Sequence, residues 1–146
     1  MVLGAVQRKG KVKTKVIPQT NIENIQKAVT EFIAPNSTMV TDEHHAYNRL
    51  KDLYVHKTVN HRQKQYVRQD EILVHTNNIE GYWNILKKQI NGIHHSVSAK
   101  HLQRYCDESA FRYNSRDCNQ DVRFANALAA CNGTLKYKVL TGKNEQ

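Results

Sequence analysis

The sequence has few cysteines and no long apolar run. Cys106, Cys118 and Cys131 are odd in number, widely spaced and free of any C-x-x-C pair, which argues against a disulfide framework and a zinc ribbon. No apolar run approaches the roughly 20 residues of a membrane-spanning helix, and residues 1–6 are too short for the apolar part of a signal peptide. We therefore expect reduced thiols, no membrane partner and a location in the cytoplasm or on the nucleoid.

Acidic residues are also scarce. The chain has 22 lysines and arginines against 13 aspartates and glutamates, a net charge of +9. Such an excess makes a polyanion the expected partner, and nucleic acid is the obvious one. The length of 146 residues leaves room for one domain with one sizeable core, and no internal repeat or low-complexity linker divides it.

The order of the predicted elements is that of an α/β protein. Two β-prone runs flank Gly10, which can take the left-handed conformation of a hairpin turn. The elements predicted in the first half are strands over 2–6 and 12–17, a helix over 22–33, a buried strand over 38–41, a short helix over 45–51, a strand over 53–58 and a polar segment over 60–71. This order predicts a mixed sheet with helices packed on it.

A central amphipathic helix follows, beginning near His75. Its apolar positions recur at helical spacing: Ile79, Trp83, Leu86 and Ile90. Its polar positions share the opposite face: Glu80, Asn84, Lys87 and Asn91. A carboxylate followed by an amide and an ammonium can hold a metal ion and a phosphate backbone together. Asn77 and Glu80 also fit a capping box, in which Glu80 only satisfies N–H groups at the helix start, so both interpretations stay open.

The last third is predicted to be helical. Residues 93–97 look like a loop, and Ser98 is the predicted cap of a helix that ends near Asn114. The predicted apolar side of that helix carries Leu102, Tyr105, Cys106 and Phe111, and its other side is mixed but basic. A further helix is predicted over 122–131, with an apolar stripe at Phe124, Ala127, Leu128 and Cys131. Nothing in the tail over 136–146 indicates what would fix it in place.

Two acids stand where an α/β protein can use them. The strand over 38–41 delivers Asp42 at its carboxyl end, where α/β sheets bind ligands, and Glu80 opens the central helix. If these two converge, their oxygens suit a pair of Mg²⁺ ions about 3.5 to 4 Å apart, which activate the attacking and leaving oxygens in phosphodiester chemistry. Lys87, Lys88 and Lys100 would then follow a phosphate backbone, although a lysine on a polar helix face is commonly just solvated.

The histidines do not form a metal motif of their own. His44 and His45 are adjacent, as are His94 and His95, and neither pair has the i, i+4 spacing of a helical metal pair. His61 and His75 are better interpreted as residues that fix loop geometry or meet phosphate.

Five short motifs in one order resemble a known family. They are Thr41-Asp42-Glu43 with Ala46-Tyr47, Val59-Asn60-His61, His75-Thr76-Asn77 with residues 79–83 and Leu86-Lys87, Val97-Ser98 with residues 101–105, and Glu108 with residues 111–116. Together they resemble the ISXO2-like transposases, DDE enzymes of bacterial insertion sequences that are related to Merlin-type elements. The resemblance covers residues 2–116.

The resemblance implies an RNase H-like fold and DNA transposition by metal-dependent cleavage and strand transfer. It implies two Mg²⁺ or Mn²⁺ ions, no small-molecule cofactor, transposon-end and target DNA as partners, and a homo-oligomer on DNA. By position, Asp42 matches the family's second catalytic aspartate, and Glu80 matches the acid on the late helix, with Asn77 as its rival. Lys87 matches the basic residue set against the DNA end. The further basic residues expected on DNA are Lys88, Lys100, Arg104 and Arg112.

One departure from the family pattern is large. The family's first catalytic aspartate lies on a strand just upstream of the hairpin, and this sequence begins at the hairpin. We therefore expect an RNase H-like domain over 1–116 without its first, central strand, and a helix with a flexible tail over 117–146. Two further functions stay open: a catalytically dead DNA-binding fragment that associates with or inhibits a full-length transposase, and a nuclease of the same fold without strand transfer.

Overall fold

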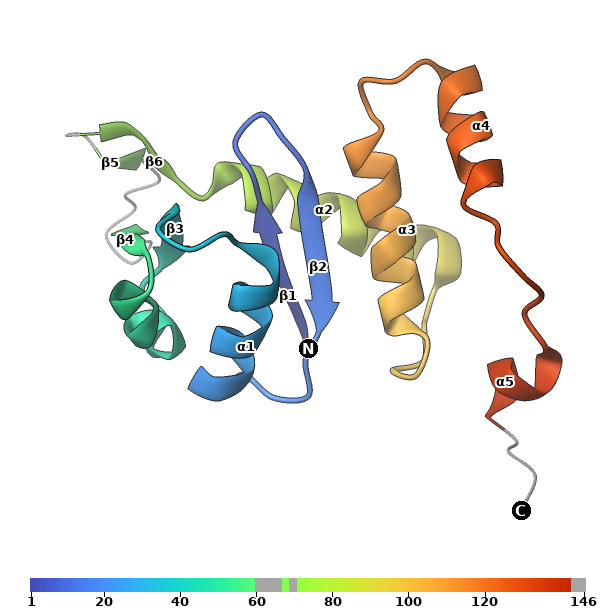
Figure 1. Cartoon of the computed structure of the whole chain (residues 1–146), viewed down its shortest axis with the longest axis horizontal. Coiled ribbons are helices and arrows are strands. Elements are labelled where there is room, and N and C mark those ends of the chain that lie inside the picture. Colours follow the sequence, from blue (N-terminus) through green and yellow to red (C-terminus); the bar gives the residue numbers. More distant parts are fainter. Residues whose placement is uncertain (60–66, 69–70, 143–146) are drawn as a thin grey trace. The chain divides into compact units, whose positions relative to one another are not determined.

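Short strands and helices alternate along the computed structural model, which describes residues 1–59, 67–68 and 71–142 (Figure 1). They form two units, Met1–Asn114 and Ser115–Gln146. The mixed α/β class is confirmed. The described strands pair as three two-stranded sheets rather than as one mixed sheet, and the RNase H-like topology stays a prediction.

Strands β1 (Val2–Val6) and β2 (Val12–Val16) form the predicted hairpin, with Val2 opposite Val16 and Val6 opposite Val12. The turn is closed by the Gly10 N–H, which donates to the Gln7 carbonyl at 3.0 Å. The prediction that Gly10 takes the left-handed conformation is wrong. That conformation falls on Lys9, with φ 52°. Gly10 instead leaves room for the Gln7 side chain, which would lie 2.6 Å from an added Cβ.

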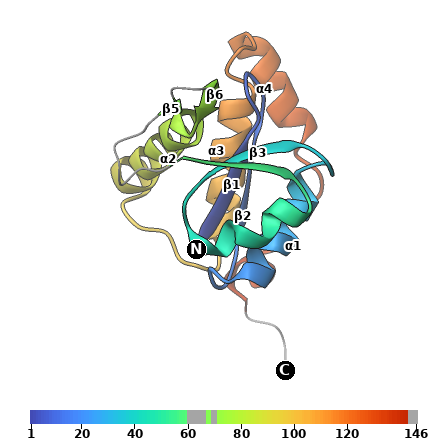
Figure 2. The ribbon, with the colours of Figure 1, turned by 90° about the vertical axis from the view of Figure 1, so that its left-hand side faces the viewer.

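The hairpin contributes side chains to two cores because alternate residues of a strand point to opposite faces. On one face, Leu3, together with Ile17 just after β2, packs with α1 (Ile22–Phe32) and with the elements that follow it. On the other face, the hairpin valines pack against α2 (Asn77–Gln89) and α3 (Leu102–Asn114). Figure 2 shows α1 and α2 on opposite sides of the hairpin.

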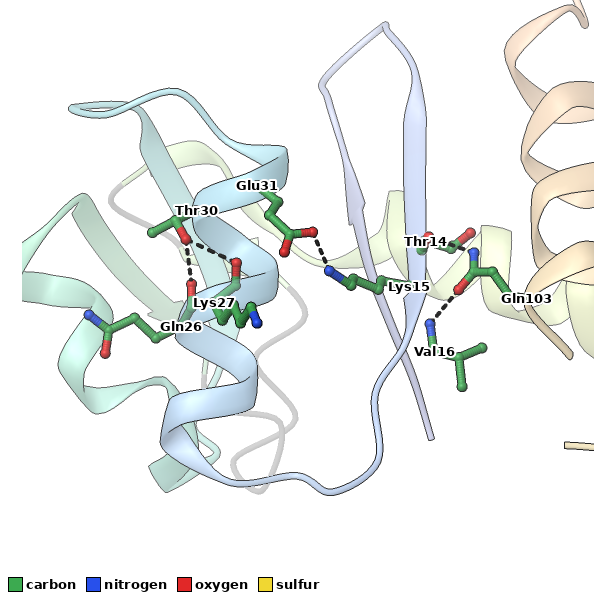
Figure 3. A network of polar contacts seen from close by, with 8 residues as sticks. All are labelled: Thr14, Lys15, Val16, Gln26, Lys27, Thr30, Glu31 and Gln103. Atoms are coloured by element: carbon green, nitrogen blue, oxygen red, sulfur yellow. Dashed lines mark hydrogen bonds and ion pairs between the residues drawn. The ribbon is translucent and has the colours of Figure 1, made fainter. Parts of the chain in front are cut away.

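Helix α1 confirms the predicted helix to within one residue at its end. Asn21 caps it by accepting a hydrogen bond from the Asn24 N–H at 2.8 Å. Lys15 of β2 forms an ion pair with Glu31 on the last turn of α1 (Figure 3). The hydrogen bond from Lys15 lowers the pKa of Glu31. Because both side chains are well exposed, the pair orients the helix more than it stabilises the fold.

Side chains of α3 satisfy the outer edge of β2. The Gln103 side chain accepts from the Val16 N–H at 2.6 Å and donates to the Thr14 carbonyl at 3.1 Å (Figure 3). Asn114 makes the same pair of bonds to Val12, at 2.6 and 2.9 Å. These amides take the hydrogen bonds that a further strand would otherwise make, which blocks edge-to-edge pairing on this side of the hairpin.

A parallel pair follows, β3 (Thr38–Asp42) and β4 (Val55–Val59), connected through the 3₁₀ helix η1 (His45–Asp52). The predicted buried strand is wrong in its burial, because only Met39 of β3 is buried. Strands β5 (Val67–Arg68) and β6 (Glu71–His75) form an antiparallel pair. Strand β5 lies in the segment over 60–71 that was predicted only as polar, and β6 begins at the end of that segment, where no strand was predicted.

The later helices depart from their predicted limits. The chain continues from α2 into a π-helical turn, η3 (Ile90–His94), whose last two residues fall in the loop predicted over 93–97. Helix α3 begins at Leu102, so Ser98 is not its cap, and Phe111 is exposed rather than in the core. Ser109, which was not predicted, takes a buried position on α3.

The second unit contains α4 (Gln120–Ala129) and α5 (Tyr137–Thr141). Helix α4 has no buried residue, and the predicted stripe is solvent-facing, with Phe124 66% and Leu128 57% exposed. The sequence pattern correctly predicts a helix there, but it does not show that the apolar side of this helix is left exposed. None of the helices in the described part of the chain has the length and apolarity to cross a membrane.

Gly4 allows the closest approach between the hairpin and α2. A Cβ at Gly4 would lie 2.7 and 2.8 Å from two atoms of the Trp83 ring. We expect Gly4→Ala to lower the free energy of unfolding by about 1–3 kcal/mol, because a ring fixed in a packed core cannot move aside. Urea denaturation followed by circular dichroism measures the change.

Gly81 provides the matched control for this substitution. It lies on α2, and a Cβ there meets no atom within 4 Å. Gly81→Ala should therefore raise stability by about 1 kcal/mol through helix propensity alone. Equal effects of the two substitutions would contradict the close packing of Trp83 on Gly4.

Candidate functional site

Asp42 is the last residue of β3, and its carboxylate is exposed. Oδ1 accepts a hydrogen bond from the His44 N–H at 3.1 Å, and His44 Nδ1 in turn accepts from the Ala46 N–H at 3.2 Å, which starts η1. Burial raises the pKa of the Tyr47 phenol, and the nearby charge of Asp42 raises it further. Asp42 therefore has a local capping role as well as the position predicted for a ligand.

Glu80 lies in the first turn of α2 and is half-buried. Its Oε1 accepts a hydrogen bond from the Thr76 hydroxyl at 2.6 Å. Thr76 is the N-cap residue, and its carbonyl accepts from the N–H groups of Ile79 and Glu80. The predicted capping box is wrong, because Asn77 is already the first helical residue and its side chain is exposed.

Asp42 on β3 and Glu80 on α2 are linked through two intervening strands, β4 and β6. Strand β3 pairs with β4, β4 contacts β6, and β6 leads directly into α2. The strand that carries Asp42 is thus linked to the helix that carries Glu80 by strand neighbours within the first unit. The convergence of the two carboxylates on shared ions stays a prediction.

A two-ion site needs more ligands than the described residues bring together. Within the described ranges, no three His, Cys, Asp or Glu side chains gather into a group that could hold a metal ion. Two Mg²⁺ ions need several oxygen ligands, and an isolated carboxylate binds them weakly. These residues therefore do not by themselves fit a pair of divalent ions, and no reaction step is assigned to a metal.

The histidine pairs have ring contacts instead of a shared ligand position. The rings of His44 and His45 stack at 4.5 Å between centroids. The ring of His94 meets Tyr105 edge-on at 4.6 Å. His61 lies outside the described residues.

Two of the predicted DNA-binding lysines lie together. Lys87 and Lys88 are exposed in the last turn of α2 and, with Asn84, Asn91 and Gly92, line a shallow, solvent-open depression. Cations at a helix carboxyl end also interact favourably with the helix dipole, so the two lysines have a structural role there as well.

The other predicted basic residues lie on or beside α3. Lys100, just before the helix, and Arg104 are exposed. Arg112 is held by Glu108, one turn earlier, through hydrogen bonds of 3.0 and 2.8 Å. Because Glu108 offsets its charge, Arg112 is a weaker phosphate ligand than an unpaired arginine would be.

The structure adds a contact that the sequence does not signal. Arg8, at the hairpin tip, donates to the His75 carbonyl at 3.1 Å, and its other terminal nitrogen lies within hydrogen-bond distance of the His75 ring nitrogens. This contact ties the hairpin tip to the residue just before the cap of α2. The partners are 67 positions apart, and no local pattern indicates such a pair.

A cluster of hydroxyls lies inside the core beneath α2. The side-chain oxygens of Thr14, Tyr82 and Ser109 are buried, and none has a hydrogen-bond partner among the described residues. Burial raises the pKa of the Tyr82 phenol. No catalytic use was predicted for this cluster, and its burial keeps a substrate from reaching it.

The comparison with known proteins gives one match. The chain matches the model of the ISXO2-like transposase domain over residues 1–114. The chain therefore belongs to the ISXO2-like transposase family, which confirms the resemblance of its motifs. Neither the curated proteins nor the solved structures provide a match.

Two half-exposed histidines, His56 and His75, predict that the stability of the first unit depends on pH. Burial lowers the pKa of His56, and burial together with the Arg8 charge lowers that of His75. A neutral His75 ring can accept a hydrogen bond from Arg8, whereas a protonated ring cannot. Because the unfolded chain takes up these protons more readily, stability is full above the ordinary histidine pKa of about 6.5 and falls below it.

We expect the free energy of unfolding to fall as the pH is lowered from about 7.5 to about 5.5, across the ordinary histidine value. Urea denaturation at the two pH values measures this change. The double variant His56→Gln/His75→Gln should show a smaller fall than the parent. An identical fall in both proteins would place the proton uptake on other groups.

Proposed function

We propose that the protein acts in DNA transposition as the transposase of an insertion sequence, through DNA cleavage and strand transfer. The observation that carries the proposal is the family match, which covers residues 1–114. The net charge of +9 supports it, because transposon ends and target DNA are polyanions. The proposal includes an RNase H-like arrangement of the first unit and assembly as a homo-oligomer on DNA.

The proposed reacting region is the carboxyl end of β3 together with the start of α2. In this proposal, Asp42 and Glu80 each contribute oxygen ligands to Mg²⁺ or Mn²⁺, and Asn77, one turn earlier than Glu80 on the same face of the helix, is the alternative to Glu80. Hydrogen bonds to backbone and side-chain neighbours limit the motion of both carboxylates, which supports a role that needs fixed ligands. Further ligands are needed, because these residues alone do not fit an ion pair.

The proposed path of DNA runs over the carboxyl end of α2. Lys87 and Lys88 would contact phosphates, and the amides of Asn84 and Asn91 beside them would donate hydrogen bonds to phosphate oxygens. Lys100, Arg104 and Arg112 belong to the same proposal as further phosphate contacts. These contacts position DNA without reading its sequence.

A second function is favoured by one observation. Since no three metal-ligating side chains gather among the described residues, the chain can bind DNA without cutting it. In that case it is a catalytically inactive DNA-binding protein that associates with a complete transposase and competes with it or inhibits it.

The first test of the proposed function is the replacement of the acids. If the parent cleaves transposon-end DNA with Mg²⁺ or Mn²⁺, we expect Asp42→Asn and Glu80→Gln to reduce cleavage by more than about 100-fold, the upper end of the loss seen for outer-shell partners of a metal. Calorimetric titration with Mn²⁺ should show weakened binding in the same variants. The variant Asn77→Ala tests whether Asn77, rather than Glu80, is the ligand on α2.

Two results would change this assignment. Equal cleavage by the parent and Asp42→Asn would remove Asp42 from the reaction. A parent that binds DNA and does not cleave it with either ion would favour the inactive function.

The second test concerns the lysines of α2. We expect Lys87→Ala/Lys88→Ala to reduce the slope of log affinity against log salt by about 0.9 for each phosphate that the variant no longer neutralises. Fluorescence anisotropy with labelled duplex DNA over a salt series measures the slope. Lys27→Ala/Lys51→Ala removes the same charge from exposed positions on α1 and η1 and should leave the slope unchanged.

A further inference from the structure

We propose that the hairpin tip is a second DNA-contacting surface, formed by Lys9, Lys11 and Lys13, which we call the basic tip. It would bind the phosphate backbone of DNA beside the start of α2. The inference rests on the proposed function in taking DNA as the partner. The sequence left this tip either solvated or near phosphate, and none of the five family motifs includes it.

The hairpin places these lysines on an uncovered part of the sheet. On β2, Val12 and Thr14 are buried while Lys13 between them is exposed, and Lys13 lies opposite the small side chain of Ala5. Lys11 lies on the same face as Lys13, one alternation nearer the turn. Helix α1 covers the base of this face, where Lys15 meets Glu31, and the tip extends beyond it (Figure 1).

The charges of the basic tip are not offset locally. Lys15 has Glu31 as its partner, whereas in the described ranges no acidic side chain forms an ion pair with Lys9, Lys11 or Lys13. Residues 1–20 contain five basic and no acidic residues. A run of one sign repels itself and is stabilised when a polyanion binds.

The conformation of the turn gives an independent observation. Lys9 has φ 52°, in the left-handed region that a residue with a Cβ rarely adopts. Its neighbour Gly10, which could adopt that region without strain, does not. Lys9 thus occupies the position of the turn where glycine would be more stable. Backbone strain of this kind is found at functional sites, where it is kept although it lowers local stability.

Arg8 fixes the direction in which the basic tip points. Its hydrogen bonds to the carbonyl and ring of His75 hold the tip beside the residue that precedes the cap of α2. DNA bound by the tip would therefore pass the turn of α2 that carries Glu80. The basic tip and Lys87 with Lys88 would then contact DNA on either side of that carboxylate.

The spacing of the lysines suits a nucleic-acid backbone. Residues two apart on a strand are about 7 Å apart, which equals about two of the 3.4 Å intervals that separate the charges of one DNA strand when measured along the helix axis. The contacts would be to phosphates alone, because lysines without neighbouring amides or aromatic rings read no base.

The test compares two double variants with the same change of charge. Lys11→Gln/Lys13→Gln leaves two phosphates without a cation, so the salt slope of duplex DNA binding should fall by about 1.8. At 0.1 M salt the affinity should be weaker by about 60-fold, if the variant and the parent bind equally at 1 M. The control Lys27→Gln/Lys51→Gln should bind as the parent does. Equal weakening in both variants would overturn the proposal, because the effect would then be one of net charge alone.

A substitution in the turn separates binding from folding. Lys9→Gly should be at least as stable as the parent in urea denaturation, because glycine relieves the left-handed conformation. It should nevertheless bind DNA more weakly. Unchanged affinity in Lys9→Gly and in Lys11→Gln/Lys13→Gln, with DNA binding intact in the parent, would overturn the basic tip and leave the proposed function standing. A parent without any salt-dependent DNA binding would overturn both.

Discussion

Burial of both faces of the β1–β2 hairpin is the constraint on which the first unit depends. A two-stranded hairpin is marginally stable by itself in water, and here it gains stability from a helical layer on each side. Leu3 contributes to the core under α1, and Val12 contributes to the core under α2 and α3. Gly4 sets how near α2 can come, because the Trp83 ring occupies the space of its missing side chain. A change in hairpin register by one residue would exchange the two faces and disrupt both cores.

The outward-facing backbone N–H and C=O groups of β2 form hydrogen bonds with side chains of α3 rather than with another strand. Gln103 and Asn114 are 11 positions apart on one face of α3, and each binds both a backbone donor and a backbone acceptor of β2. Strand formation and helix docking are therefore coupled, since neither amide has its partners until α3 lies along the hairpin. The same docking places Ser109 and Tyr82 in the core with unpartnered hydroxyls, which limits how much the packing stabilises this region.

The acids of the proposed site also serve the local fold. Asp42 initiates the turn into η1 through the His44 N–H, and Glu80 accepts from the hydroxyl of the N-cap residue Thr76. The two acids combine a proposed ligand role with local hydrogen bonding because of their positions. Strand ends and helix starts leave backbone groups that need hydrogen-bond partners. The family relation gives the class of protein, and the basic surfaces on α2 and at the hairpin tip suit a DNA partner. The hairpin tip lies beside the start of α2, and Lys87 with Lys88 lies in its last turn, so the proposed binding extends along the helix that carries Glu80.

Local patterns in the sequence determined the hairpin, the capped helix after Asn21, the strand that ends at Asp42, the central helix and the family. Each depends on neighbours within a few residues or on motifs in a fixed order. The candidate site was predictable only as a set of residues, because convergence of Asp42 with Glu80 depends on contacts between elements far apart in the chain. Only the tertiary structure revealed the Arg8–His75 contact, the amide bonds from α3 to β2 and the solvent-facing stripe at Phe124, since periodicity specifies a face but not what covers it. The position of the left-handed residue, Lys9 rather than Gly10, also came from the structure alone, because residue preference by itself favours glycine there.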